Sequence, residues 1–234
     1  MTRRRISMLV YLFDIDGTLL LTGGAGTRAL NSLFLQRFGV RSAMDGIRPA
    51  GKTDPLIVAE MIERALGRPP ADGEIEDLLA AYVPLLAAEI AASDRFRVMP
   101  GAVEAVRGLA AAGVPVGLAT GNVREAARLK LTRIGLWETF AFGGFGDDSP
   151  DRAALVAAAI ERARRAVAAD LPASAFVVVG DTPRDVAAAR ACGCRAVCVP
   201  TGGYEAGDLA ACAPDAVLAS LRDLPGWHAA QTGG

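Results

Sequence analysis

The sequence has little histidine and no cysteine spacing typical of metal sites. Its only histidine is His228, and no two of its four cysteines form a CxxC pair. These shortages argue against a zinc site and against a nucleophile built from a thiol and an imidazole. Because oxygen ligands remain, a bound metal is predicted to be a hard cation such as Mg²⁺.

The chain also lacks a strong net charge and a long apolar run. With 25 basic and 26 acidic residues its formal net charge is −1, so the sequence indicates no nucleic-acid partner. No apolar run approaches the roughly 20 residues that a membrane-spanning helix needs. We therefore expect a cytoplasmic protein with no membrane partner, and nothing in the composition indicates an oligomeric state.

Lysine is scarce as well. Lys52 and Lys130 are the only lysines among 25 basic residues. An ammonium group is a compact point charge, whereas a guanidinium group is broad and planar. Where arginine is the usual cation, a lysine is a candidate for a position that needs the smaller charge. Solvated positions on a loop and on a helix face are the alternative.

What the sequence does contain is a regular alternation of strands and helices. Apolar runs rich in β-branched residues are typical of buried parallel strands, and segments with helical periodicity lie between them. This alternation predicts an α/β fold, a doubly wound (Rossmann-like) parallel sheet with helices on both faces. The predicted strands are Leu9–Phe13, Val116–Ala119, Phe176–Val179 and Ala196–Val199, with weaker candidates at Phe140–Phe142 and Ala216–Leu218.

Residues 23–98 interrupt this alternation. Three apolar stripes with helical spacing predict three helices, and the second begins at the helix-start pair Asp54-Pro55. We therefore predict a small all-helical cap of residues 23–98, inserted after the first strand. The α/β core is predicted to comprise residues 1–22 and 99–234.

Two carboxylates follow the first predicted strand, in the run FDIDGT. Side chains two positions apart in a strand point the same way, so Asp14 and Asp16 are expected to project together from its end. Since the helical insert begins shortly after them, it is expected to cover them as a lid.

Polar groups also follow two later strands. The run Thr120-Gly121-Asn122 follows one of them, and Asp181 and Asp185 follow another. Each group alone is compatible with an ordinary turn or helix cap. Ligands of open α/β sheets bind beyond the carboxyl ends of the strands, so these groups are expected to meet in one crevice.

This set of residue types indicates phosphoryl transfer. Clustered carboxylates suit Mg²⁺, and a hydroxyl with amides at a helix start suits a phosphate group. A carboxylate can attack phosphorus and form an aspartyl phosphate. Two unit charges about 4 Å apart repel by ~1 kcal/mol in water and ~4 kcal/mol at a protein-like dielectric. A bound cation and a nearby ammonium group would reduce that repulsion.

Four sequence motifs carry a family resemblance. They are Asp14-Ile15-Asp16-Gly17-Thr18, Thr120 after a strand, a lysine, and Gly180-Asp181-Thr182-Pro183-Arg184-Asp185. With them the chain resembles the haloacid dehalogenase superfamily, and within it the phosphoglycolate-phosphatase-like members. The resemblance spans the whole chain, and the helical insert matches that superfamily's cap.

The resemblance implies roles for the carboxylates. Asp14 would be the nucleophile and a metal ligand. Asp16 would protonate the leaving oxygen and then activate water, while its backbone carbonyl binds Mg²⁺. Asp181 would complete the protein's share of the metal ligands, and Asp185 would orient the metal site without touching the ion.

The phosphate-binding groups follow the resemblance less closely. Thr120 and the amide of Gly121 would hold the phosphoryl oxygens. Many relatives add a lysine before a proline, where this chain reads DSPDR. Lys130 is the candidate for that role and Arg152 is the reserve. Lys52 lies where the resemblance implies a substrate-specificity loop, so it is a candidate contact to a carboxylate or second phosphate of the leaving group.

We therefore predict a Mg²⁺-dependent phosphatase, a phosphoric monoester hydrolase. It would hydrolyse a small phosphorylated metabolite, phosphoglycolate-like or a sugar phosphate, through an aspartyl-phosphate intermediate. Asp16 favours this over a dehalogenase, because a halide leaves without a proton. A sugar phosphomutase of the same superfamily is the alternative. A phospho-accepting signalling receiver is a distant one, disfavoured by the chain length, the cap and Asp16.

Overall fold

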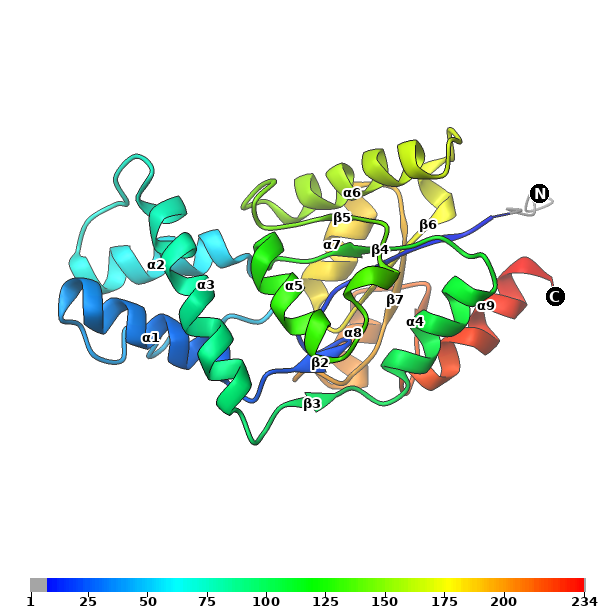
Figure 1. The fold of residues 1–234 in the computed structure, drawn as a ribbon. Helices are drawn as coiled ribbons and strands as arrows, with labels where there is room; N and C mark the ends of the chain where they lie inside the picture. The colour runs from blue at the N-terminus through cyan, green and yellow to red at the C-terminus, as the bar shows by residue number, and fades with distance from the viewer. Residues whose placement is uncertain (1–7, 234) are drawn as a thin grey trace.

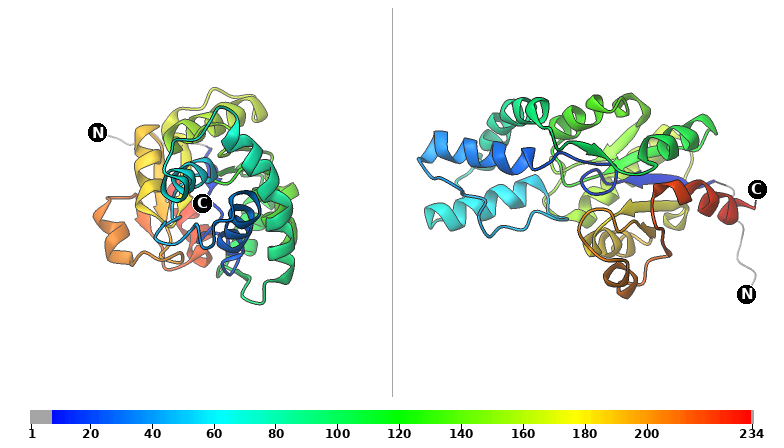
Figure 2. Two further views of the ribbon diagram at one scale, coloured as in Figure 1. Left: turned by 90° about the vertical axis from the view of Figure 1, so that its left-hand side faces the viewer. Right: turned by 90° about the horizontal axis from the view of Figure 1, so that it is seen from below.

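The computed structural model describes residues 8–233 and has two parts. One is a sheet with helices on both faces, and the other is a group of three helices beyond one end of the sheet (Figure 1). The view from below in Figure 2 shows the same three helices projecting away from the sheet. None of the helices in this described part has the length and apolar character needed to cross a membrane.

The larger sheet has its strands in the order β5-β4-β1-β6-β7-β8, and all of its strand pairs are parallel. Strand β1 therefore lies between β4 and β6, at the point where the strand order reverses direction. The strands are β1 (Val10–Phe13), β4 (Val116–Ala119), β5 (Phe142–Gly144), β6 (Phe176–Gly180), β7 (Arg195–Cys198) and β8 (Ala216–Val217).

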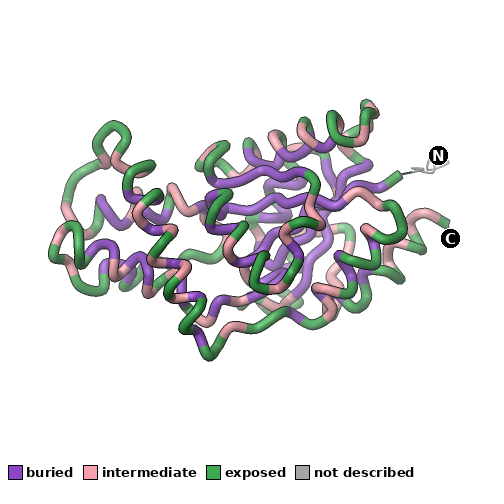
Figure 3. Tube along the Cα trace, viewed as in Figure 1, coloured by how far each residue is buried: buried purple, intermediate pink, exposed green. Residues whose placement is uncertain are grey.

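Side chains of β1 alternate between two hydrophobic cores. Leu9, Tyr11 and Phe13 face a core shared with α4, α5 and α9, whereas Val10 and Leu12 face a core shared with α6, α7 and α8. Because both faces are covered, the strand is apolar throughout and buried (Figure 3). The helices are α4 (Ala102–Ala111), α5 (Arg124–Arg133), α6 (Arg152–Ala166), α7 (Pro183–Ala191), α8 (Ala206–Ala211) and α9 (Leu224–Thr232).

The three helices of the insert share a separate hydrophobic core. They are α1 (Ala25–Phe38), α2 (Asp54–Leu66) and α3 (Glu74–Ala92). Val123 and Ala126 belong to the same core, so the insert packs on the start of α5. Strand β2 (Leu20–Leu21) pairs antiparallel with β3 (Arg97–Val98), so the two chain segments that join insert and sheet run side by side.

The α/β fold class predicted from the sequence is confirmed. The prediction of the fifth strand at Phe140–Phe142 was two residues early, because the strand runs through Gly143 and Gly144. A Cβ atom at Gly144 would lie 1.9 Å from the carbonyl oxygen of Leu155, so glycine is needed where α6 crosses this strand closely. The division at residues 22/23 and 98/99 stays a prediction.

Candidate active site

A cavity of about 290 Å³ lies where the carboxyl ends of the central strands meet the cap. Asp14, Thr120 and Asp181 directly follow β1, β4 and β6, which the register sets side by side. The cavity lining includes most of the predicted site residues: Asp14, Asp16, Lys52, Gly121, Lys130, Arg152 and Asp181. Thr120 and Asp185 do not line the cavity and are buried beside it.

The loop after β1 turns sharply at Gly17. This residue has a φ of +86°, and a Cβ atom there would lie 2.3 Å from a carboxylate oxygen of Asp181. Only glycine satisfies both conditions without strain. The turn brings the hydroxyl of Thr18 within 3.0 Å of Asp181, to which it donates a hydrogen bond. The FDIDGT run is therefore shaped by its contact with the motif after β6.

Three carboxylates gather on one side of the cavity. Oxygen atoms of Asp14, Asp181 and Asp185 lie within 4.8 Å of one another, and all three side chains are buried. Burial raises the pKa of Asp181 to about 8, and it raises that of Asp14 to about 6 against the opposing effect of Arg152. A buried all-oxygen set in which Asp14 and Asp181 hold their negative charge with difficulty fits a hard divalent cation.

Arg152 compensates part of this charge. Its guanidinium lies 3.1 Å from Asp14 and also donates to Asp185. The other carboxylate oxygen of Asp185 accepts from the amide of Thr182 at 3.0 Å and from its hydroxyl at 2.7 Å. Asp185 thus fixes the start of α7 and positions Arg152, so both of its oxygens are engaged.

Asp16 is held by groups of the β4–α5 region. The ammonium of Lys130 lies 2.6 and 2.8 Å from its two oxygens, and the amide of Asn122 donates to it at 2.8 Å. Asn122 also donates to the hydroxyl of Thr120 at 2.8 Å and accepts from Lys130. We did not predict this role for Asn122, since its place after Thr120 is equally typical of a turn.

Lys130 and Arg152 therefore have different partners. Lys130 pairs with Asp16, whereas Arg152 pairs with Asp14. From the sequence, Lys130 was the candidate for the phosphate-binding cation and Arg152 the reserve. In the structure both cations line the cavity.

The cap contributes a further carboxylate, Asp54, which contacts the loop after β4. Its amide donates to the carbonyl of Gly121 at 2.7 Å, and its carboxylate accepts from the amide of Val123 at 2.9 Å. Burial raises the pKa of Asp54 to about 6, and Lys130 opposes that rise. A Cβ atom at Gly121 would lie 2.4 Å from the carbonyl oxygen of Lys52, so the cap loop rests directly on the loop after β4.

Lys52 lines the cavity from the cap side, on the loop that precedes α2. Its ammonium forms an ion pair with Glu60, one of the residues of α2. The structure therefore brings Lys52 to the same cavity as Asp14, and it adds an acidic partner that the sequence did not predict.

The sequence and the fold were compared with those of known proteins. Residues 8–193 match the haloacid dehalogenase-like hydrolase family. The chain belongs to this family. It is 31% identical over 233 residues to phosphoglycolate phosphatase 1 of Pseudomonas aeruginosa, covering 94% of this chain and 79% of that protein. The predicted superfamily and the predicted hydrolase are confirmed, and relatives that carry the name phosphatase agree with a reaction on a phosphate ester.

Solved structures share the fold of this hydrolase. A hydrolase from Pseudomonas syringae aligns with a TM-score of 0.69 at 23% identity, covering 94% of this chain and 98% of that one. CbbY from Rhodobacter sphaeroides, crystallised in complex with phosphate, aligns with a TM-score of 0.69 at 22% identity, covering 93% and 96%. At these identities the likeness shows a common fold.

The hydrogen bond between Asp54 and Val123 can be tested apart from the charge of Asp54. Asp54→Ala is expected to unfold with ~1–3 kcal/mol less free energy than Asp54→Asn, because only asparagine keeps an oxygen for the buried amide. Chemical denaturation of both variants measures the difference. Exposed Asp147 accepts from the neighbouring amide of Arg124, so its alanine variant should lose less than ~1 kcal/mol. Equal stability of the two Asp54 variants would contradict this assignment.

Proposed function

We propose that this hydrolase is a Mg²⁺-dependent phosphatase that acts on a small phosphorylated metabolite and carries the phosphoryl group on Asp14. One observation carries the proposal: buried Asp14 lines the cavity and belongs to the acidic group with Asp181, while Asp16, held by Lys130, lines the same cavity. Support also comes from the named phosphatases among the relatives.

In the first step a carboxylate oxygen of Asp14 forms a bond to phosphorus. The bond from phosphorus to the leaving oxygen breaks, and Asp16, which enters this step protonated, gives that oxygen its proton. The pKa of Asp14, raised by burial to about 6, keeps most of this side chain ionised at neutral pH. A desolvated carboxylate is a better nucleophile than a hydrated one, which favours this residue for the attack.

In the second step Asp16, now ionised, takes a proton from water. The water oxygen bonds to phosphorus, the bond to Asp14 breaks, and inorganic phosphate is released. Lys130 and Asn122 fix the position of Asp16 through three contacts of 2.6 to 2.8 Å. A fixed carboxylate can serve both as acid and as base without reorganising between the steps.

Phosphoryl oxygens are proposed to bind to the amide of Gly121, the hydroxyl of Thr120 and the ammonium of Lys130. Gly121 and Lys130 line the cavity. Thr120 is fully buried beneath Asn122, which supports a part in shaping the loop as well. Arg152 is a second candidate for a phosphoryl oxygen, because it lies beside Asp14.

Asp14, Asp181 and the backbone carbonyl of Asp16 would hold Mg²⁺, with Asp185 orienting this set through Arg152 and Thr182. The ion would neutralise the repulsion between the phosphate and the carboxylates. Lys52 is proposed to contact the part of the substrate beyond the phosphate, since it lines the cap side of the same cavity.

Phosphate release tests the proposed reaction directly. The protein is expected to release inorganic phosphate from a panel of small phosphate monoesters with Mg²⁺ and to lose that activity in EDTA. Asp14→Asn should lower kcat by about 10⁴-fold or more, because the nucleophile is lost. Exposed Asp45 offers the control, as Asp45→Asn should retain full activity. Isomerised hexose phosphate without free phosphate would point to the mutase and contradict the proposal.

The acid role of Asp16 predicts a dependence on the leaving group. In single turnovers Asp16→Asn should slow release of an alkyl alcohol by about 10²–10⁴-fold, while release of nitrophenolate, which needs little protonation, should slow far less. Rapid-quench assays with the two classes of ester measure both rates. Equal losses for both esters would remove the acid role.

Proton competition predicts the pH dependence of Mg²⁺ binding. The pKa of Asp181 is raised from 3.8 to about 8 in the folded protein, so between these two values the metal-free fold binds more protons than the unfolded chain and loses stability as pH rises toward 8. Because Mg²⁺ needs the ionised carboxylate, it should raise the Tm more at pH 8.5 than at pH 6.5. Asp181→Asn should reduce this difference in thermal-shift measurements. A larger Mg²⁺ effect at pH 6.5 would contradict the assignment.

A further inference from the structure

Every cation that lines the cavity has a carboxylate partner. Among the described residues these cations are Lys52, Lys130 and Arg152. Lys130 and Arg152 pair with Asp16 and Asp14, the two carboxylates of the proposed reaction. These two cations are proposed to interact with the phosphoryl group. A second anionic group on the substrate would therefore need a cation from the cap.

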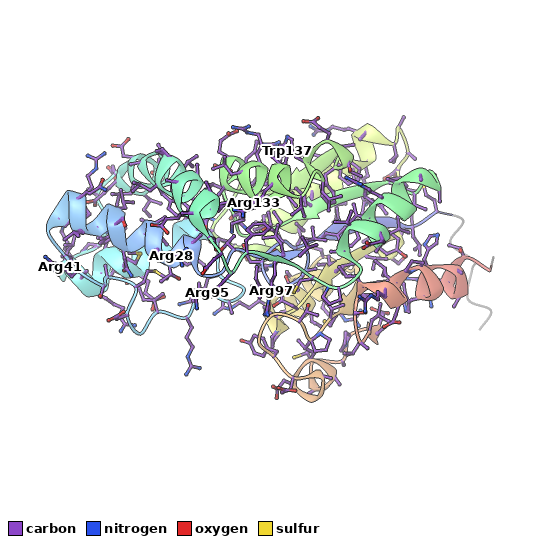
Figure 4. The ribbon with its side chains drawn as sticks, turned by 60° about the horizontal axis from the view of Figure 1, so that its bottom comes forward. Arg28, Arg41, Arg95, Arg97, Arg133 and Trp137 are labelled. Atoms are coloured by element: carbon purple, nitrogen blue, oxygen red, sulfur yellow. The ribbon has the colours of Figure 1, made fainter. Side chains whose placement is uncertain are left out.

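Lys52 is the one cation that the cap contributes to this lining, within the described part of the chain. Other cap arginines do not line the cavity. Figure 4 shows Arg41 at the end of the cap away from the sheet and Arg95 near the junction of cap and core. Arg28 is paired with Glu89 at 2.6 Å. Among the described cations that line the cavity, Lys52 is therefore the one outside the proposed phosphoryl site that could pair with a carboxylate or second phosphate on the substrate.

The charge of Lys52 is largely cancelled by Glu60. The ammonium forms an ion pair with this carboxylate, and only 19% of the Lys52 side chain and 29% of the Glu60 side chain are exposed. The hydrogen bond from Lys52 lowers the pKa of Glu60, so the glutamate stays ionised at neutral pH. An ammonium has three N–H donors, so Lys52 keeps donors for an uncharged hydroxyl oxygen.

The remaining cap side of the cavity suits an uncharged group. Asp54 adds a buried carboxylate there, which would repel an anion. The other lining side chains of the cap offer hydroxyl or apolar surface; they include Thr27, Tyr82, Leu30, Met44 and Ile57. Hydroxyl groups and apolar carbon match an alcohol better than a carboxylate.

We propose that the substrate is a phosphate monoester of a small uncharged alcohol, and that Glu60 is a specificity-determining residue because it holds Lys52 and cancels its charge. This inference rests on the proposed phosphatase function and narrows its substrate class. It revises the expectation from the sequence that Lys52 pairs with an anionic leaving group. Rejection of an anion by an unfavourable charge is a common source of specificity.

The test compares two esters of the same size. They are 2-hydroxyethyl phosphate, whose leaving alcohol is neutral, and 2-phosphoglycolate, which has a carboxylate in place of the CH₂OH group. The wild-type protein is expected to show a kcat/KM about tenfold or more higher for the neutral ester. Glu60→Gln should shift the ratio of the two kcat/KM values about tenfold toward phosphoglycolate, mainly through KM.

Two further variants separate specificity from structure. Lys52→Met in the Glu60→Gln background should abolish the shift, because the freed ammonium causes it. Glu63 lies on the exposed face of the same helix, so Glu63→Gln should leave the ratio of the two kcat/KM values unchanged. A Glu60→Gln variant with an unchanged ratio, or one in which the shift persists without Lys52, would overturn the role of Glu60.

Failure of this inference differs from failure of the proposed function. If both esters and 4-nitrophenyl phosphate release phosphate with Mg²⁺ but wild type prefers phosphoglycolate, the substrate class is wrong and the phosphatase stands. If none of the three esters is hydrolysed, the proposed function itself fails. A preference for the neutral ester that Glu60→Gln reduces supports both.

Discussion

The structure depends on how one edge of the sheet tolerates crowded negative charge. Asp14, Asp181 and Asp185 are buried with oxygen atoms within 4.8 Å of one another. Parallel strands that end at the same edge impose this crowding, and burial makes it costly for Asp14 and Asp181 to ionise. Arg152 reduces part of the repulsion among these carboxylates, and the proposed cation would reduce the rest. The features that suit this edge for phosphate chemistry are therefore those that make it electrostatically unstable alone.

Charge compensation also connects the cap to the core. Lys130 forms an ion pair with Asp16 in the core, and its charge also favours the ionised form of Asp54 in the cap. The two hydrogen bonds of Asp54 then fix the loop from Gly121 to Val123. The cap is thus more than a cover, because its α2 helix begins in contact with the loop that carries the proposed phosphate-binding amide. The position of the cap and the geometry of the loop after β4 are therefore coupled through a few short contacts.

Local patterns predicted what depends on local structure. Apolar runs followed by FDIDGT or by Gly180-Asp181 mark strand ends, and parallel topology then brings Asp14 and Asp181 together. Contacts between distant segments could not be predicted in this way. Asp54 matches a helix start, so its bond to Val123, 69 residues away, had no signal. The pairing of Lys52 with Glu60 depends on how a loop folds back on α2, and the strand at Gly143 and Gly144 has residues that lack strand propensity.

Direct detection of phosphate on Asp14 is the most decisive measurement for this account. Asp16→Asn protein should be mixed with 4-nitrophenyl phosphate and Mg²⁺, quenched in acid and digested for mass spectrometry. The account predicts that the peptide containing position 14 gains the mass of one phosphoryl group, and that Asp14→Asn in the same background does not. Phosphoryl transfer to another residue, or nitrophenolate release with an unmodified Asp14 peptide at every quench time, would contradict it.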